Sequence, residues 1–221
     1  MTIHFSEFMP TVLYLRVTSH FMSETDLTHP KVFIIESLTF ENEQNGYFEG
    51  EVISKILNFS DIEHKYYYIR TKSEFVHLIT EFKKLNFRYL HISCHGNSSS
   101  LATTLESIPF NELSFILQNV LDRKRLFISA CSATNDKLAD EIFGLTECYS
   151  IIGPDETINI DDAAIFWASF YHLMFKQNGK AMKKETLQPT LNKLVALHNV
   201  PLKYYSSSKS NSKGWKEVSI K

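Results

Sequence analysis

The stretches RYLHISCHGNSSS (88–100) and KRLFISACSATN (124–135) decide the fold. Each begins with an apolar, β-branched run that is typical of a buried strand, and then changes abruptly to small and polar residues. We expect the first strand over 88–94 and the second over 125–130. In parallel sheets, functional residues gather beyond the carboxyl ends of the strands. One strand end carries His-Gly and the other carries cysteine, so the sequence predicts a chemical site there.

Strand-like and helix-like segments alternate on both sides of these two stretches. Apolar runs predict further strands over 31–37 (KVFIIES), 64–71 (HKYYYIRT) and 149–152. Apolar residues at helical spacing predict helices over 48–59, 73–85 (with Ser73 as N-cap), 109–121, 136–143 and 161 to about 176. This alternation is typical of an α/β domain with a mostly parallel central sheet and helices on both faces.

Three segments follow from this pattern. Residues 1–30 form an N-terminal extension or edge strand, with an extended-looking stretch at Thr11–Val17. Residues 31–180 form the α/β core. Residues 181–221 supply a C-terminal helix and a hairpin whose strands, LKYY (202–205) and WKEVSI (215–220), flank a serine-rich loop.

Composition and charge exclude several classes of protein. The 221 residues are 43% hydrophobic and 22% charged, which is ordinary for a soluble globular domain. The formal net charge of −2 and the lack of a basic stripe argue against nucleic-acid or membrane-surface partners. No apolar run approaches the roughly 20 residues that span a bilayer.

The cysteines and the N-terminus predict a cytoplasmic protein. Cys94, Cys131 and Cys148 are odd in number and have no disulfide-like spacing. The opening MTIHFSEFMPTVLYLRV lacks the charged and apolar regions of a secretory signal. We therefore expect free thiols in a reducing compartment.

A histidine and a cysteine at neighbouring strand ends suit nucleophilic catalysis. Consecutive strands of such a sheet are often adjacent, so His95 and Cys131 are expected to lie close together. A free thiol ionises near pH ~8.5, and a nearby imidazole takes its proton during attack. The N–H groups of Gly96 and Cys131 would bind the oxyanion of the tetrahedral intermediate.

The motifs HISCHG (91–96) and LFISACSA (126–133) resemble those of the caspase-like cysteine peptidases, clan CD, in which a His-Gly strand end precedes the strand of the nucleophilic cysteine. The similarity is most specific to the CHAT group, which includes separase-like proteins. Residues 149–174 resemble the CHAT strand, loop and long helix that ends in a Phe-Tyr pair. The resemblance spans about 31–180 and implies a caspase-like three-layer sandwich.

The resemblance also implies an activity. It points to a cysteine endopeptidase with a His95–Cys131 dyad, no third catalytic residue, no metal and no organic cofactor. Its substrate would be a specific protein, cut in a regulated prokaryotic stress or antiviral defence pathway. The trigger would be an activating partner protein or self-cleavage.

Some residues depart from the family pattern. Cys131 follows His95 by 36 residues, fewer than the roughly 50 typical of caspases. Ser132 replaces the arginine that can follow a caspase cysteine, so a preference for aspartate is not implied. Ser129 stands where some basic-specific relatives carry aspartate.

An acid for a basic-specific pocket would have to come from elsewhere in the chain. We expect Ser129 to contribute to substrate binding, together with the acids of the loop at 154–162, which are Asp155, Glu156, Asp161 and Asp162. Asp161 and Asp162 also suit the positive N-terminal end of a helix, which is the simpler interpretation.

Other interpretations of the chain remain open. A catalytically inactive caspase-like module would use the strand-end crevice or residues 182–221 for protein interaction. A flavodoxin-like nucleotide binder is disfavoured because no glycine-rich loop follows the first strand, where 36–40 read ESLTF.

The remaining candidates have structural interpretations. His91, Cys94 and His95 do not make a zinc site, because no second cluster of ligands lies nearby in sequence and a strand turns His91 and Cys94 to opposite faces. Cys94 is expected in the core, Cys148 has no assigned function, and residues 98–100 are expected to form an exposed linker.

Overall fold

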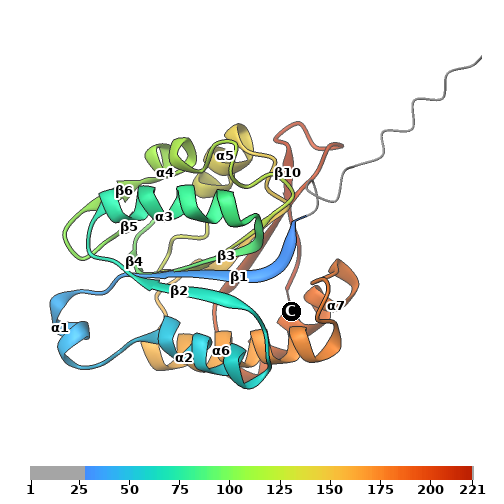
Figure 1. Cartoon of the computed structure of the whole chain (residues 1–221). Helices are drawn as coiled ribbons and strands as arrows, with labels where there is room; N and C mark the ends of the chain where they lie inside the picture. The colour runs from blue at the N-terminus through green and yellow to red at the C-terminus, as the bar shows by residue number, and fades with distance from the viewer. Residues whose placement is uncertain (1–27, 221) are drawn as a thin grey trace, which may run out of the picture.

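A seven-stranded sheet lies between two layers of helices (Figure 1). The computed structural model describes residues 28–220, so Thr11–Val17 and nearly all of the expected segment 1–30 lie outside the described residues. The strands of this sheet run in the order β10-β9-β8-β7-β3-β1-β2. They are β1 (His29–Glu36), β2 (His64–Tyr68), β3 (Phe87–Ser93), β7 (Arg125–Ser129), β8 (Ser150–Pro154), β9 (Leu202–Ser207) and β10 (Trp215–Glu217).

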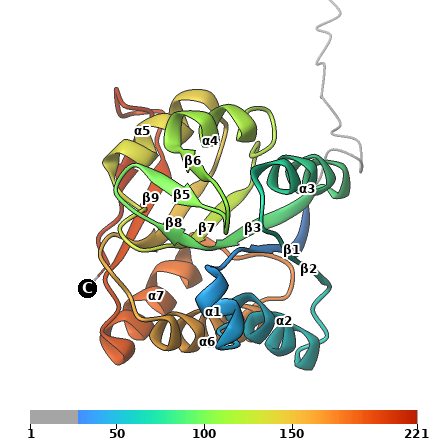
Figure 2. The same ribbon diagram turned by 90° about the vertical axis from the view of Figure 1, so that its left-hand side faces the viewer.

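The helices divide between the two faces of the sheet (Figures 1 and 2). Helices α3, α4 and α5 cover one face, and α2, α6 and α7 cover the other. The short helix α1 lies beyond the end of β1. The helices are α1 (Phe40–Gln44), α2 (Glu49–Phe59), α3 (Lys72–Leu85), α4 (Phe110–Leu117), α5 (Asp136–Leu145), α6 (Ile160–Gln177) and α7 (Lys184–His198).

Parallel pairing joins β2, β1, β3, β7 and β8. Glu36 pairs with Ser93, and Ser93 pairs with Ser129, so one polar residue ends each of the three central strands in a single row. The expected mostly parallel α/β sheet with helices on both faces is confirmed. The carboxyl ends of β1, β3 and β7 meet at one edge, where such sheets place their crevices.

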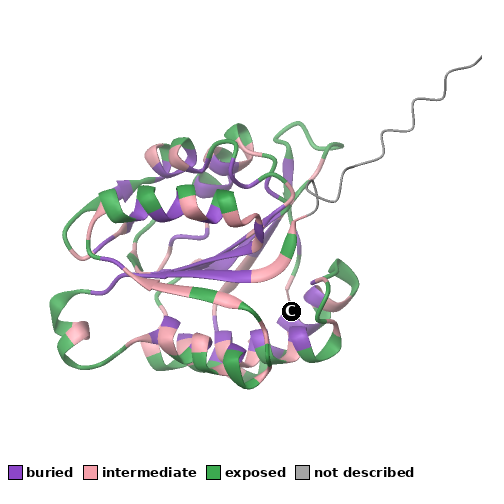
Figure 3. Cartoon of the chain, in the orientation of Figure 1, coloured by how far each residue is buried: buried purple, intermediate pink, exposed green. Residues whose placement is uncertain are grey.

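Two apolar clusters hold the layers together, and burial is concentrated along the sheet (Figure 3). On the α6 face, Phe127 contacts Trp167, Phe170 and Tyr171 with ring centroids 5.3–5.8 Å apart. These side chains are fully buried, so the aromatic residues of α6 form part of the core.

The C-terminal segment adds two antiparallel strands to the sheet. Strand β9 pairs with β8, and β10 pairs with β9. The Trp215 indole N–H donates to Asp140 at 2.9 Å, and the Tyr205 hydroxyl donates to Asp136 at 2.8 Å. Both acids belong to α5, so the hairpin is fastened to the helical layer.

The structure corrects two predicted helix boundaries. The N-cap of α3 is Thr71 and not Ser73, because Thr71 and Glu74 form a capping box that satisfies two backbone N–H groups. Helix α4 ends at Leu117 and does not reach 121, since Asn119 has a left-handed φ of 58° that no α-helix accommodates.

A second, three-stranded sheet was not expected from the sequence. It consists of β4 (His95–Gly96), β5 (Ser100–Ala102) and β6 (Ser107–Pro109) in antiparallel order. Ser98 and Ser99 are exposed, but Ser100 is buried at the start of β5, so the prediction of an exposed linker over 98–100 is wrong at its last residue. The side-chain oxygen of Asn97 accepts hydrogen bonds from the backbone N–H groups of Ser99 and Ser100 and fixes this turn.

None of the helices between residues 28 and 220 is both long and apolar enough to cross a membrane.

Glu36 ties the end of β1 to the start of α2. Its carboxylate is fully buried and accepts hydrogen bonds from the Gly50 N–H at 2.8 Å and the Tyr66 hydroxyl at 2.7 Å. A Cβ at Gly50 would lie 2.9 Å from the Tyr66 ring, so only glycine permits this close approach. Burial raises the pKa of Glu36 from 4.5 to about 7, although both hydrogen bonds oppose the shift.

This shift predicts a pH dependence of stability. A carboxyl whose pKa is higher in the folded state stabilises the fold fully below about pH 4.5, and this stabilisation is lost as the pH rises to about 7. Glu36→Gln mimics the protonated form. We expect the variant to gain stability relative to wild type between pH 4.5 and pH 8, by up to about 3 kcal/mol.

Urea unfolding at both pH values measures this difference. Glu41→Gln, on the exposed face of α1, is the matched control. Its free energy of unfolding relative to wild type should be the same at pH 4.5 and pH 8. An equal effect of Glu36→Gln at pH 4.5 and pH 8 would contradict the assignment.

Candidate active site

Strand register brings His95 and Cys131 to the same edge of the sheet. Ser93 and Ser129 are paired residues, and the Cys94 N–H donates to the Ser129 carbonyl at 3.0 Å. His95 and Cys131 each follow two residues after that pair. Both residues lie beyond the ends of β3 and β7, and both border the hollow that the start of α6 closes.

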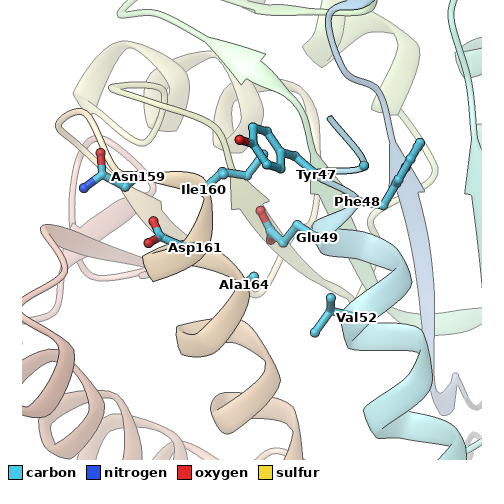
Figure 4. A pocket seen from close by; sticks show the side chains of 9 residues that line it. Tyr47, Phe48, Glu49, Val52, Asn159, Ile160, Asp161 and Ala164 are labelled. Atoms are coloured by element: carbon cyan, nitrogen blue, oxygen red, sulfur yellow. The ribbon is translucent and has the colours of Figure 1, made fainter. Parts of the chain in front are cut away.

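His95 and Cys131 line one hollow of about 250 Å³. Residues just before and within the first turns of α6 form the opposite wall, and a second hollow of about 550 Å³ shares Glu49, Asn159 and Ile160 with the first (Figure 4). The imidazole and the thiol that the sequence predicts at one edge of the sheet therefore both border the same cavity.

Cys131 sits in a tight turn directly after β7. Its side chain is half-buried, and the Sγ lies 3.6 Å from the Ile158 carbonyl oxygen, to which the thiol donates. Ser132, the next residue, has a left-handed φ of 57°, which is uncommon for a residue other than glycine. Such backbone conformations cluster at functional sites, where the surrounding structure holds them in place.

The other two cysteines have a different environment. Burial raises the pKa of the Cys94 thiol to about 12, although the residue keeps partial exposure, and burial likewise raises that of Cys148 to about 12. Both thiols therefore stay protonated near neutral pH. Cys94 packs against the cluster on the α3–α5 face, as expected, and it also lines the hollow beside His95 and Cys131.

His95 is exposed and is held by a residue that the sequence analysis did not identify. Its Nε2 lies 2.9 Å from the side-chain nitrogen of Asn42, in helix α1. An amide offers both a donor and an acceptor, so Asn42 can bond either protonation state of the ring by turning its amide. No local signal marks Asn42, because it lies 53 residues upstream of His95 in a helix that the apolar pattern did not reveal.

Gly96 lets the His95 strand lie directly against the Cys131 turn. A Cβ at this position would be 2.9 Å from the Ala130 Cβ and 3.3 Å from the Cys131 carbonyl oxygen. Within the described residues, the Cys131 N–H donates to no backbone carbonyl, whereas the neighbouring N–H groups of Ser132 and Ala133 both do. The two amides expected to bind an oxyanion therefore come from segments in contact.

Of the five residues expected to bind substrate, only two line a hollow in the structure. Ser129 lines the hollow of Cys131, and Asp161 lines the adjoining one. Three acids line neither hollow. Asp155 lies 4.0 Å from the Lys203 ammonium, the Asp162 carboxylate accepts from Asn159, and Glu156 contributes its backbone carbonyl to the Ser132 N–H.

Glu49 is the acid that sequence reasoning missed. It begins α2, lines both hollows and is only 4% exposed. Its Oε2 accepts hydrogen bonds from the Ser93 hydroxyl at 3.1 Å and the Ser129 hydroxyl at 2.8 Å. In sequence it looks like any acid in the first turn of a helix, so nothing local distinguishes it.

No metal site emerges among residues 28–220, where no group of three or more histidine, cysteine or acidic side chains is arranged to hold an ion. His91 is buried on the α6 face, with its Nδ1 3.1 Å from the Tyr171 hydroxyl. Cys94 packs on the opposite face, so the two residues do not share a site.

No protein-family model matches the sequence, and no curated protein sequence is significantly similar to it. Among solved structures, the chain resembles a secreted C11 cysteine protease from Bacteroides thetaiotaomicron that was solved in complex with an irreversible peptide inhibitor. The TM-score is 0.54 at 8% identity, over 80% of this chain and 66% of that one. The chain thus spans slightly less than two thirds of that protease. The likeness confirms the caspase-like α/β fold, and it does not bear on membership of the CHAT group.

Proposed function

We propose that the chain is a cysteine endopeptidase that acts through His95 and Cys131. The observation that carries this proposal is the shared hollow: on a caspase-like fold, the imidazole and the half-buried thiol line one cavity at the carboxyl edge of the sheet. Cys148 is buried and does not line this hollow, and Cys94, which does line it, has a thiol whose pKa burial raises to about 12.

The proposed reaction is acyl transfer to the sulfur. The Cys131 thiol gives its proton to His95, and its Sγ attacks the peptide carbonyl carbon. The N–H groups of Gly96 and Cys131 bind the resulting oxyanion. His95 then gives the proton to the leaving amine, and a thioester remains. Water attacks the thioester, which releases the new carboxyl terminus and restores the thiol.

Asn42 would orient the imidazole through these steps. His95 is exposed, so its ring needs an anchor to keep one nitrogen directed at the reacting atoms. The hydrogen bond at Nε2 leaves Nδ1 free for the proton transfer. The expected dyad thus gains a positioning residue.

The biological setting is proposed from the resemblance alone. It comprises membership of the CHAT group, a specific protein substrate, a regulated prokaryotic stress or antiviral defence pathway in the cytoplasm, and an activating partner protein or self-cleavage as the trigger. A binding module without catalysis is the alternative that the first experiment must exclude.

A diverse peptide library tests the proposed activity. We expect the wild-type chain to cleave a subset of its members, and Cys131→Ala or His95→Ala to lower kcat/KM by at least about 1,000-fold. Cys148→Ala, which removes a buried thiol far from the hollow, is the control and should retain the activity.

Two results would contradict the proposed peptidase activity. Cleavage that survives Cys131→Ala would mean that another group is the nucleophile. A folded wild-type chain that cleaves no peptide, alone or with its captured partner, would favour the binding module.

Asn42→Ala tests the positioning role. We expect kcat to fall about tenfold with little change in KM, because one hydrogen bond of roughly 1.4 kcal/mol no longer holds the ring in its reactive orientation. Gln44→Ala, on the same helix, is the matched control. An Asn42→Ala effect confined to KM, or no effect, would remove Asn42 from the mechanism.

A further inference from the structure

Helix α1 carries the side chain that bonds His95, yet it buries nothing of its own. It has five residues, none of them buried, and it lies beyond the end of β1, on the connection to α2 (Figure 1). Helices shorter than about 12 residues are marginal in water without tertiary support. The position of Asn42 therefore depends on the contacts that hold α1 against the rest of the chain.

Glu43 makes charge-assisted contacts between α1 and the segment that follows β2. Its carboxylate accepts two hydrogen bonds from the Arg70 guanidinium, from Nε at 2.9 Å and from Nη2 at 2.6 Å. The Tyr68 hydroxyl donates to the same carboxylate. The Glu43 side chain is only 12% exposed, and the Arg70 contact, followed by that of Tyr68, holds the pKa of its carboxyl below the ordinary value. A bidentate pair of this kind fixes the direction of the contact as well as its distance.

Arg70 is itself fixed by hydrogen bonds on both sides of its backbone. Its N–H donates to the Glu74 carboxylate at 2.9 Å, and its carbonyl accepts from the Leu105 N–H at 3.1 Å. The ring centroid of Phe40, the first residue of α1, lies 5.7 Å from the guanidinium carbon. The guanidinium therefore extends from an anchored backbone and contacts α1 at two of its residues.

Tyr68 holds both ends of the segment that carries α1. The Leu38 N–H, before the helix, donates to the Tyr68 hydroxyl at 3.4 Å. The ring of Phe48, after the helix, lies with its centroid 5.3 Å from that of Tyr68. Because Tyr68 is the last residue of β2, these contacts fasten the segment to the sheet.

Asn42 and Glu43 are consecutive, so their side chains leave the helix about 100° apart. The Glu43 side chain reaches Arg70, and the Asn42 amide nitrogen lies 2.9 Å from the His95 Nε2. The Asn42 N–H also donates to the Thr39 hydroxyl at 3.2 Å, which caps the helix and fixes the backbone at this point. A shift of α1 relative to β2 would therefore move the amide away from the imidazole.

We propose that Glu43 is a positioning residue for the His95 imidazole and that it acts through α1 and Asn42. This inference rests on the proposed function, in which His95 carries the proton from the sulfur to the leaving amine. Glu43 lines neither hollow, so its effect on the reaction is indirect. Loss of its charge would weaken the contact with Arg70, and Asn42 would no longer meet the ring in one orientation.

The kinetics of Glu43→Gln test this role. We expect kcat to fall about tenfold, as for Asn42→Ala, with KM changed by less than about threefold, because the residues that line the hollows are untouched. Glu41→Gln removes an exposed carboxylate from the same helix and is the matched control. It should leave both kinetic constants unchanged.

A double-mutant cycle separates positioning from a general structural role. If Glu43 acts through Asn42, Glu43→Gln should not lower kcat further in the Asn42→Ala protein, so the double variant should be about tenfold slower than wild type and not about 100-fold. Additive losses, or a loss confined to KM, would overturn the inference. If Glu43→Gln does not fold, Arg70→Lys takes its place in the cycle, because it keeps the positive charge and loses the two parallel bonds.

The NMR signal of the His95 ring separates this inference from the proposed activity. The carbon-bound ring proton between the two nitrogens is assigned by the loss of its signal in His95→Ala. Asn42→Ala and Glu43→Gln should each shift this signal, and the double variant should show the shift of Asn42→Ala alone.

The two proposals fail in different ways. A chain that shows these shifts and cleaves no peptide would retain the positioning contact and overturn the peptidase. A chain that cleaves peptides, with a His95 signal and a kcat that Glu43→Gln leaves unchanged, would retain the peptidase and overturn the inference.

Discussion

The parallel pairing of β3 with β7 is the constraint on which the rest of the site depends. The ladder from Tyr89–Arg125 to Ser93–Ser129 continues into the bond from the Cys94 N–H to the Ser129 carbonyl. Because the two chains leave the sheet in register, the residues two positions further on emerge at the same edge. A slip of one residue between β3 and β7 would shift His95 along the sheet edge relative to Cys131.

The second support of the site is the junction between β1 and α2. Glu36 at the end of β1 accepts the Gly50 N–H, and this bond fixes the first turn of α2 over the strand ends. Glu49 thereby accepts hydrogen bonds from Ser93 and Ser129, so one carboxylate links α2 to the ends of β3 and β7. A buried polar network of this kind favours one arrangement of its members.

The parts of the protein that the sequence predicts are those with a local signal. Apolar runs that end abruptly in His95-Gly96 and in Cys131 mark both strand ends, and the 3.6-residue period marks α2 and α6. Asn42 and Glu49 have no such signal: β1 and its following loop bring them to the hollow through tertiary contacts. Asp155, Glu156 and Asp162 were expected to supply an acid for a substrate pocket, and none of the three lines either hollow.

The rate of thiol alkylation at near-neutral pH tests the central claim most directly, since it depends on the environment of one sulfur and on no substrate. Iodoacetamide labelling of the folded chain, followed by peptide mass spectrometry, reports each cysteine separately. Cys131 should react at least about tenfold faster than Cys94 and Cys148, whose burial raises their pKa values to about 12, and His95→Ala should abolish this advantage. Equal labelling of the three cysteines, or fast labelling of Cys131 that is indifferent to His95, would contradict the account.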